Sequence, residues 1–274
     1  MADRTFLPVR SDIVFRMFFG DKRNTEFLIS FLKSVLRISE GDYETIEVTN
    51  PYLAKDYPDD KLGIVDVKLR TKYGKIIHIE IQLQILPELK ARLIFYGAKL
   101  ITEQIGIGDK YADIQKVISI IITEETLVTD SPRYHHRFTF YDPDAGVEFS
   151  DLQEINTLEL DKLPNASDGT ELYDWAKFIA ADTEEELTMA AESNPQIGKA
   201  TLILRELSAD ERARDLYERR ERERMDEISR IDGARNEEKR EIAKNLLGDL
   251  PIETIAARTG LTVTEVEELK RQGN

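Results

Sequence analysis

The chain has 274 residues, enough for one sizeable α/β domain with an appended helical part, and 41% of them are hydrophobic, which suffices for a core. It has no cysteine, which excludes disulfides and fits a cytoplasmic protein, and its sequence shows neither a signal peptide nor an apolar run long enough to span a bilayer. The net charge of −15 argues against a broad nucleic-acid-binding surface, because such surfaces gain affinity from Lys and Arg.

The N-terminal part predicts two helices and a strand. Residues 12–19 predict the first helix, and residues 25–37 predict a second helix with apolar side chains at helical spacing. Asp12 begins the first helix, where its negative charge stabilises the helix dipole. Residues 44–49 predict a strand that leads into the next segment.

Residues 63–84 alternate between apolar and polar side chains and predict a β-hairpin. Its loop of three residues ends in a glycine, which suits a type I turn followed by a left-handed residue. That loop pairs Thr71 with Lys75. Counting back along both strands then places Asp66 directly across from Glu80.

Asp66, Glu80 and Gln82 share one face of this hairpin. Opposed carboxylates in a sheet repel unless something positive lies between them, and a divalent cation would fill that place. Mg²⁺ takes carboxylate oxygens as ligands, lowers the pKa of its bound water and stabilises charge on a phosphoryl group. Gln82 would then orient the water or contact the scissile phosphate. Lys68 shares the face and offers positive charge, and the alternative interpretation of the whole face is a polar surface in contact with solvent.

Residues 87–105 predict a helix that begins at Pro87 and ends at Gly106. On this helix Arg92 and Tyr96 are four residues apart and share one face. They would either clamp a phosphate or form a bridge that holds the helix to the sheet carboxylates.

The apolar run 114–123 predicts a strand in the middle of a sheet that is covered on both sides. Residues 134–141 and 152–160 predict a further pair of strands. His135 and His136 are adjacent and therefore point to opposite faces, which disfavours a shared zinc ion.

From Glu171 onward the pattern is helical, and we expect Trp175, Phe178 and Ile179 to belong to the core. Residues 205–244 mix Arg and Glu in nearly equal number. Such alternation is typical of an exposed helix with many ion pairs and of an oligomerisation arm. A basic helix that reads DNA is the alternative.

The tail predicts a small helix-turn-helix, because Pro251 starts a helix, Gly260 permits a turn and Thr262 can cap a final helix. Glutamates on that last helix favour a packing or protein-contact role over DNA reading. We therefore expect three parts: an α/β core over residues 1–165, a charged helical extension over 166–240 and the tail over 241–274.

Several short segments match a known family in their order and spacing. They are residues 12–16, Asn24, residues 31–32, Asp66, residues 80–82, Arg92, Tyr96, Gln104, Gly106, Tyr111 and residues 158–160. Together they resemble the PD-(D/E)XK nuclease superfamily, and more narrowly the recombination-promoting nuclease (Rpn) family, which is grouped with transposases. The resemblance covers about residues 8–270.

The resemblance implies a restriction-endonuclease-like α/β fold, a mixed sheet flanked by helices, with an α-helical C-terminal extension. It implies Asp66 and Glu80 as metal ligands and makes Asp12 a candidate for a third acid, beside its role at the helix dipole. Gln82 stands where the superfamily usually has lysine, whose ammonium orients the nucleophile or neutralises the transition state. The Rpn-like subset itself commonly shows glutamine there.

We therefore expect a magnesium-dependent DNA endonuclease, with Mn²⁺ or Ca²⁺ as alternative ions, linked by resemblance to recombination or mobile-element biology. Its catalytic residues would be Asp66, Glu80 and Gln82. Because the acidic excess is concentrated at residues 142–192, a local basic surface is still compatible with the sequence, and we expect weak DNA binding with low sequence specificity. We also expect homo-oligomers through the helical extension. The alternative is a catalytically weak, DNA-associated regulatory or scaffolding protein that keeps the fold.

Overall fold

The computed structural model describes residues 5–49 and 65–272, so the first two residues of the expected hairpin, Gly63 and Ile64, lie outside the described residues. Contacts divide the chain into two compact units, Met1–Tyr217 and Glu218–Asn274. The three-part division expected from the sequence stays a prediction, and each of the two units is described by itself. Within the described ranges, the helices include none that is both long enough and apolar enough to cross a membrane.

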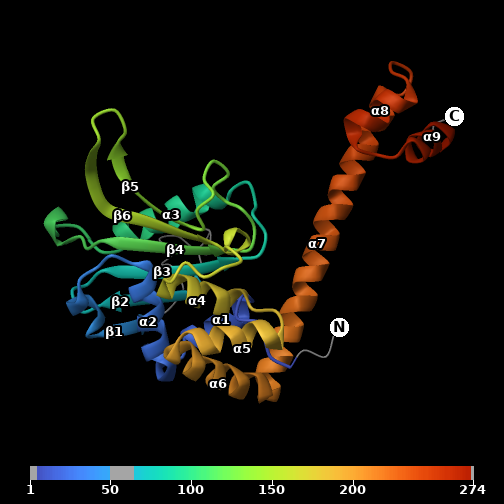
Figure 1. The fold of residues 1–274 in the computed structure, drawn as a ribbon. Coiled ribbons are helices and arrows are strands. Elements are labelled where there is room, and N and C mark those ends of the chain that lie inside the picture. The colour runs from blue at the N-terminus through green and yellow to red at the C-terminus, as the bar shows by residue number, and fades with distance from the viewer. Residues whose placement is uncertain (1–4, 50–64, 273–274) are drawn as a thin grey trace. The chain divides into compact units, whose positions relative to one another are not determined.

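A mixed six-stranded sheet in the order β1-β2-β3-β4-β6-β5 forms the centre of the first unit (Figure 1). Strands β3, β4 and β6 run parallel to one another, whereas the pairs β1–β2, β2–β3 and β5–β6 are antiparallel. The strands are β1 (Ile46–Thr49), β2 (Val67–Thr71), β3 (Ile76–Gln82), β4 (Val117–Thr123), β5 (His135–Asp142) and β6 (Val147–Glu159).

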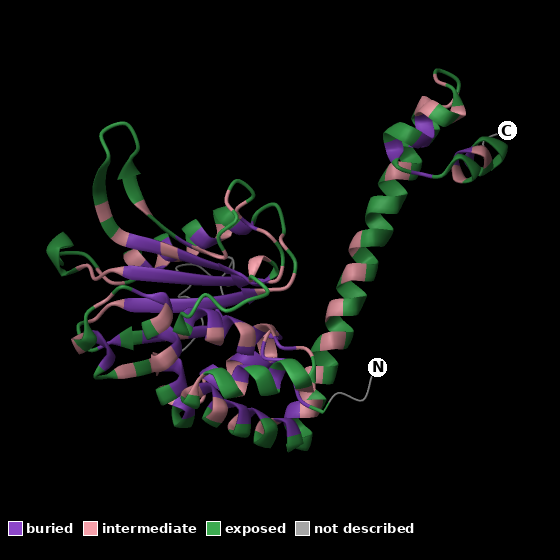
Figure 2. Ribbon diagram, in the orientation of Figure 1, coloured by how far each residue is buried: buried purple, intermediate pink, exposed green. Residues whose placement is uncertain are grey.

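Helices cover both faces of this sheet, which confirms the expected α/β class. The main core joins one face of β3 and β4 to five helices: α1 (Asp12–Phe19), α2 (Thr25–Val35), α4 (Glu171–Ala180), α5 (Glu184–Ser193) and α6 (Pro195–Ala209). On the other face, α3 (Leu89–Thr102) packs its buried leucines against Ile76, Val117 and Ile121. Figure 2 shows the resulting burial of the central strands on both sides. As expected, Trp175 is fully buried in the main core.

Helix boundaries differ from the sequence prediction where capping groups decide them. The helical spacing over residues 171–193 is realised as two helices, because Thr183 and Glu186 form a capping box that starts α5. The helix expected over residues 87–105 is shorter, since Glu88 is the N-cap of α3 and the helix ends at Thr102. Pro87 therefore precedes the helix instead of starting it.

The second unit consists of most of α7 (Glu211–Leu246) together with α8 (Ile252–Thr259) and α9 (Val263–Gln272). The exposed middle of α7 carries ion pairs between residues three apart, as the charge alternation predicts: Arg220–Glu223, Glu221–Arg224 and Glu227–Arg230. The end of α7 forms a small core with α8 and α9. Pro251 directly precedes α8, Gly260 ends it in the left-handed conformation with φ 71°, and Thr262 exchanges hydrogen bonds with Glu265 at the start of α9.

Candidate active site

The β2–β3 hairpin has the predicted turn and register. Gly74 adopts φ 84°, the left-handed region that favours glycine, and the Thr71 N–H donates to the Lys75 carbonyl at 2.9 Å. The ladder then pairs Val67 with Ile79. The ladder ends at this pair, one residue after Asp66, so the placement of Asp66 directly across from Glu80 stays a prediction.

The ladder changes at Asp66, whose side chain takes over as an acceptor. The Asp66 N–H still donates to the Ile79 carbonyl at 3.1 Å. The Ile81 N–H, however, donates to Asp66 Oδ2 at 2.9 Å instead of to a strand carbonyl. The other oxygen, Oδ1, accepts from Arg16 Nη2 at 3.0 Å. The Asp66 carboxylate is therefore fixed at the end of β2, where α1 and β3 meet.

Glu80 lies in the middle of the buried strand β3 and is 3% exposed. Its Oε2 lies 3.7 Å from Nη2 of Arg92 on α3, and its Oε1 is buried without a hydrogen-bond partner among the described residues. The alternative interpretation of this hairpin face as a solvated surface is therefore wrong. The reason is tertiary, because α3 covers the polar side of β3.

Burial shifts the pKa values of both carboxyl groups. Desolvation raises the pKa of Glu80 to about 7; the Arg92 cation lowers it and the negative charge of Asp66 raises it further. Desolvation also raises the pKa of Asp66, against the Ile81 N–H and the Arg16 guanidinium, which favour its charged form. In both carboxyl groups, burial disfavours the negatively charged form. A bound proton or cation would offset this cost, so the pair favours taking up positive charge.

Asp12 lies near this pair. Its negative charge contributes to the raised pKa of Asp66, while its own Oδ1 accepts the N–H of Ile13 at the start of α1. Both expected roles, third acid and helix-start charge, therefore stay open. In the part of the chain that the structure describes, no three Asp, Glu, His or Cys side chains come close enough together to hold a metal ion.

The remaining expected residues lie on β2, β3 and α3. Gln82 is the half-buried last residue of β3 and pairs with Thr123 of β4. The bridge expected of Arg92 is its contact with Glu80. Tyr96, one turn further along α3, has its pKa raised by desolvation and then by the Glu80 charge. Lys68 contacts Glu103 instead, at 3.5 Å.

Two residues at this site were missed by sequence reasoning. Arg16 lies one turn after Asp12 on α1, and that spacing of four was the available signal. His78 lies two residues before Glu80 on the same side of β3, with Nε2 2.5 Å from Ser119 Oγ. Complete burial lowers the pKa of His78 to about 3, so this imidazole is neutral.

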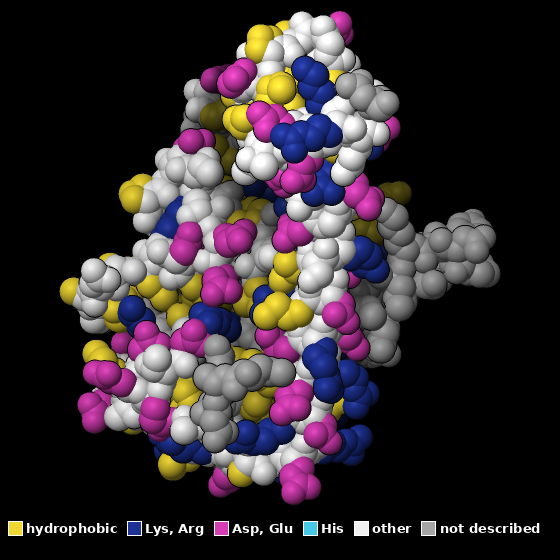
Figure 3. All heavy atoms as spheres, turned by 90° about the vertical axis from the view of Figure 1, so that its right-hand side faces the viewer, with side chains coloured by type: hydrophobic (Ala, Val, Ile, Leu, Met, Phe, Trp, Pro, Cys, Tyr) yellow, Lys and Arg dark blue, Asp and Glu magenta, His cyan; other side chains and the backbone are white. Residues whose placement is uncertain are grey.

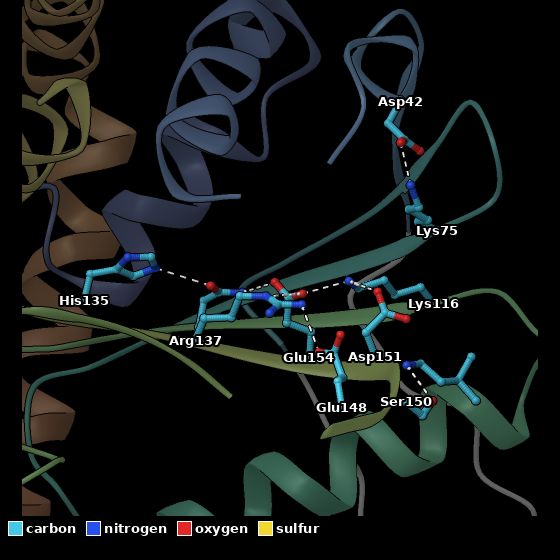
Figure 4. A network of polar contacts seen from close by, with 11 residues as sticks. Asp42, Lys75, Lys116, His135, Arg137, Glu148, Ser150, Asp151 and Glu154 are labelled. Carbon is cyan, nitrogen blue, oxygen red and sulfur yellow. Dashed lines mark hydrogen bonds and ion pairs between the residues drawn. The ribbon is translucent and has the colours of Figure 1, made fainter. Parts of the chain in front are cut away.

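A second polar network lies at the other end of the sheet (Figure 4). Its centre is Glu154 of β6, which is 2.7 Å from Lys116 Nζ and 2.9 Å from Arg137 Nε. His135 contacts Asn156 in this network, whereas the adjacent His136 contacts Glu159. The two histidines thus have different partners, as expected. The charges of this network are paired with one another, and we assign it a structural role.

Comparisons with known proteins identify the family. A family model described as PD-(D/E)XK nuclease family transposase matches residues 9–234, a span that includes the hairpin, α1 and α3. Searches of curated proteins and of solved structures found no match. Because the family model covers most of the chain, the chain belongs to the PD-(D/E)XK nuclease family transposases.

Proposed function

We propose that this protein is a metal-dependent DNA endonuclease that hydrolyses phosphodiester bonds. One observation carries the proposal: Asp66 and Glu80 are buried beside each other, and Glu80 Oε1 is a buried acceptor with no partner among the described residues. A buried carboxylate oxygen that lacks a hydrogen-bond partner is costly, and a divalent cation would supply a partner. The donor set is made of hard oxygens, which fits Mg²⁺ first, with Mn²⁺ or Ca²⁺ as alternatives.

Asp66 and Glu80 would hold the cation, with Asp12 as the candidate for a further ligand. When bound, the ion would lower the pKa of a water molecule and neutralise charge on the phosphate. The Ile81 N–H supports this role, since its hydrogen bond to Oδ2 holds the Asp66 carboxylate in one orientation. Such fixed orientation reduces the cost of assembling the site.

The chain's own residues would position the substrate. The Gln82 amide would orient the attacking water, and Arg92 and Tyr96 would bind phosphate oxygens from α3. In the reaction the water oxygen bonds to phosphorus and the bond from phosphorus to one sugar oxygen breaks. The electron pair of that bond goes to the sugar oxygen, which takes up a proton, while the attacking water releases one to solvent.

We propose weak DNA binding with low sequence specificity. On the face shown in Figure 3, Lys and Arg side chains are interspersed with Asp and Glu side chains. With a net charge of −15, few phosphates would be neutralised, and binding would depend strongly on salt. Homo-oligomers formed through the ion-paired helix α7 would add contacts with DNA, and recombination or mobile-element biology is the proposed setting.

A second candidate is a DNA-associated regulatory or scaffolding protein that hydrolyses DNA slowly or not at all. Two observations favour it: Gln82 cannot carry the charge of a lysine, and no group of three metal-binding side chains is present among the described residues. This candidate keeps the fold and the DNA contact but predicts no metal-dependent turnover.

Nicking of supercoiled plasmid separates the two candidates. The wild type, Asp66→Ala and Glu80→Gln are compared in Mg²⁺ and in EDTA, with Glu47→Gln as a matched control. Glu47 occupies the exposed position of β1, so its substitution removes one charge from the same sheet outside the site. Cleavage by the wild type and the control alone, and only in Mg²⁺, supports the endonuclease. Equal activity in all four proteins would attribute nicking to contamination and favour the scaffold.

A further inference from the structure

We propose that Arg16 supplies the positive charge that Gln82 lacks, as a residue that binds the scissile phosphate. In the resting protein it lies on Asp66, and it moves to the phosphate once a cation occupies the carboxylate pair. This inference rests on the proposed endonuclease function and assigns a role to a residue outside the expected catalytic set.

The Arg16 guanidinium is only partly used in the resting protein. Its Nη2 contacts Asp66 Oδ1 at 3.0 Å, while its Nε is buried and has no hydrogen-bond partner among the described residues. The side chain as a whole is 39% exposed, so a ligand at the mouth of the site can reach it. A guanidinium has five donors in a planar fork and binds phosphate oxygens in pairs. Arg16 therefore has hydrogen-bond donors available beside Asp66.

Other cations on the neighbouring elements have carboxylate partners other than Asp66. Lys68, which shares the hairpin with Asp66, contacts Glu103 at the end of α3. Arg10, just before α1, lies 3.1 Å from Glu124 and 2.7 Å from Asp182. Arg92 contacts Glu80 from α3, on the opposite face of the sheet from α1, and its charge is paired with this second carboxylate. Arg16 is the cation that contacts Asp66, the first of the two expected metal-binding carboxylates in the sequence.

Arg16 and the metal ion would compete for Asp66, so the proposed role predicts opposite effects of an Arg16 substitution on metal affinity and on turnover. A metal ion and a guanidinium on one carboxylate repel each other, so Arg16 weakens metal binding as long as it lies on Asp66. Removing its charge should strengthen metal binding and yet slow the reaction. An arginine that merely clamps Asp66 in place would behave differently, because its loss would weaken metal binding and turnover together.

The test compares wild type, Arg16→Ala, Arg16→Gln and Arg16→Ala/Gln82→Lys, with Arg23→Ala as the matched control. Arg23 follows α1 in the chain but is paired with Asp21 in an exposed position. Calorimetric titration with Mg²⁺ in the absence of DNA is the first readout, and plasmid cleavage is the second. Arg16→Gln keeps hydrogen-bond donors but removes the charge. It can therefore still be compared with the wild type if Arg16→Ala does not fold.

We expect both single Arg16 variants to bind Mg²⁺ at least as tightly as the wild type while turnover falls by about 100-fold, the usual cost of losing one donor to transition-state charge. Gln82→Lys should restore most of that loss, because it places a positive charge where the superfamily usually has lysine. Arg23→Ala should match the wild type in both readouts.

Three outcomes would overturn the assignment. Weaker Mg²⁺ binding in the Arg16 variants would make Arg16 a clamp, and unchanged turnover would make it dispensable; either result leaves the endonuclease intact. A wild type that neither binds Mg²⁺ nor cleaves DNA would instead refute the proposed function, and the role of Arg16 would fall with it.

Discussion

Substituting Glu80 by glutamine should make the metal-free protein more stable at neutral and alkaline pH. The wild-type carboxyl has its pKa raised from 4.5 to about 7 by burial. Below pH 4.5, the pKa in the unfolded chain, this carboxyl is protonated in both states and its burial costs no ionisation free energy. As the pH rises from 4.5 through 7, the unfolded chain loses its proton first, and the folded protein therefore loses stability. Glutamine has nearly the same shape and does not ionise, so the variant escapes this loss.

The magnitude follows from the size of the shift. A rise of this size corresponds to about 3 kcal/mol once the pH is well above 7, since one pKa unit equals about 1.4 kcal/mol. About 2 kcal/mol of that should develop between about pH 5.5 and 8.5, a range above the isoelectric point of about 4.8. The contact between Glu80 and Arg92 reduces the stability gained by Glu80→Gln, because the neutral amide is a weaker partner for the Arg92 guanidinium.

Urea unfolding in EDTA, followed by fluorescence, measures this difference. The chain has one tryptophan, and Trp175 is fully buried in the core of the first unit, so its emission reports on that unit. The free energies of unfolding of the wild type and Glu80→Gln should diverge steadily as the pH rises, and Glu47→Gln controls for the change in net charge. Parallel curves for the wild type and Glu80→Gln over this range would refute the reasoning. Adding Mg²⁺ at high pH should then stabilise the wild type and not the variant.

Three further outcomes test the site. Asp66→Asn and Glu80→Gln should each lose Mg²⁺ binding in calorimetry together with cleavage, because so few protein ligands hold the ion; unchanged binding in both would place the metal elsewhere. The Mg²⁺ affinity of the wild type should rise with pH up to about 7 and then level off, since Glu80 must lose its proton first, and a flat profile would contradict the raised pKa. Gln82→Ala should slow plasmid cleavage with little change in metal affinity or folding, and Gln82→Lys should be tolerated far better; equal rates for both variants would remove Gln82 from the mechanism.

Local rules determine the hairpin. The alternation of side chains along residues 65–82 and the glycine at position 74 depend on neighbouring residues alone, so the sequence by itself determined the register that pairs Val67 with Ile79. The same holds for the buried central strand β4 and for the capped tail helices, whose signals lie within a few residues of each element. The family resemblance, which the match to residues 9–234 confirms, also needs only sequence.

Tertiary packing decided the electrostatics of the site. Arg16 and Asp66 are 50 residues apart, and their contact exists only because α1 packs across the sheet. The burial of Glu80 likewise depends on α3, which covers a face that polar alternation alone predicts to be open to solvent. Periodicity shows which side of a strand a residue occupies but carries no information about what lies over that side. The sequence therefore identified the carboxylates, whereas only the packing of α1 and α3 decided their burial, their raised pKa values and the arginines beside them.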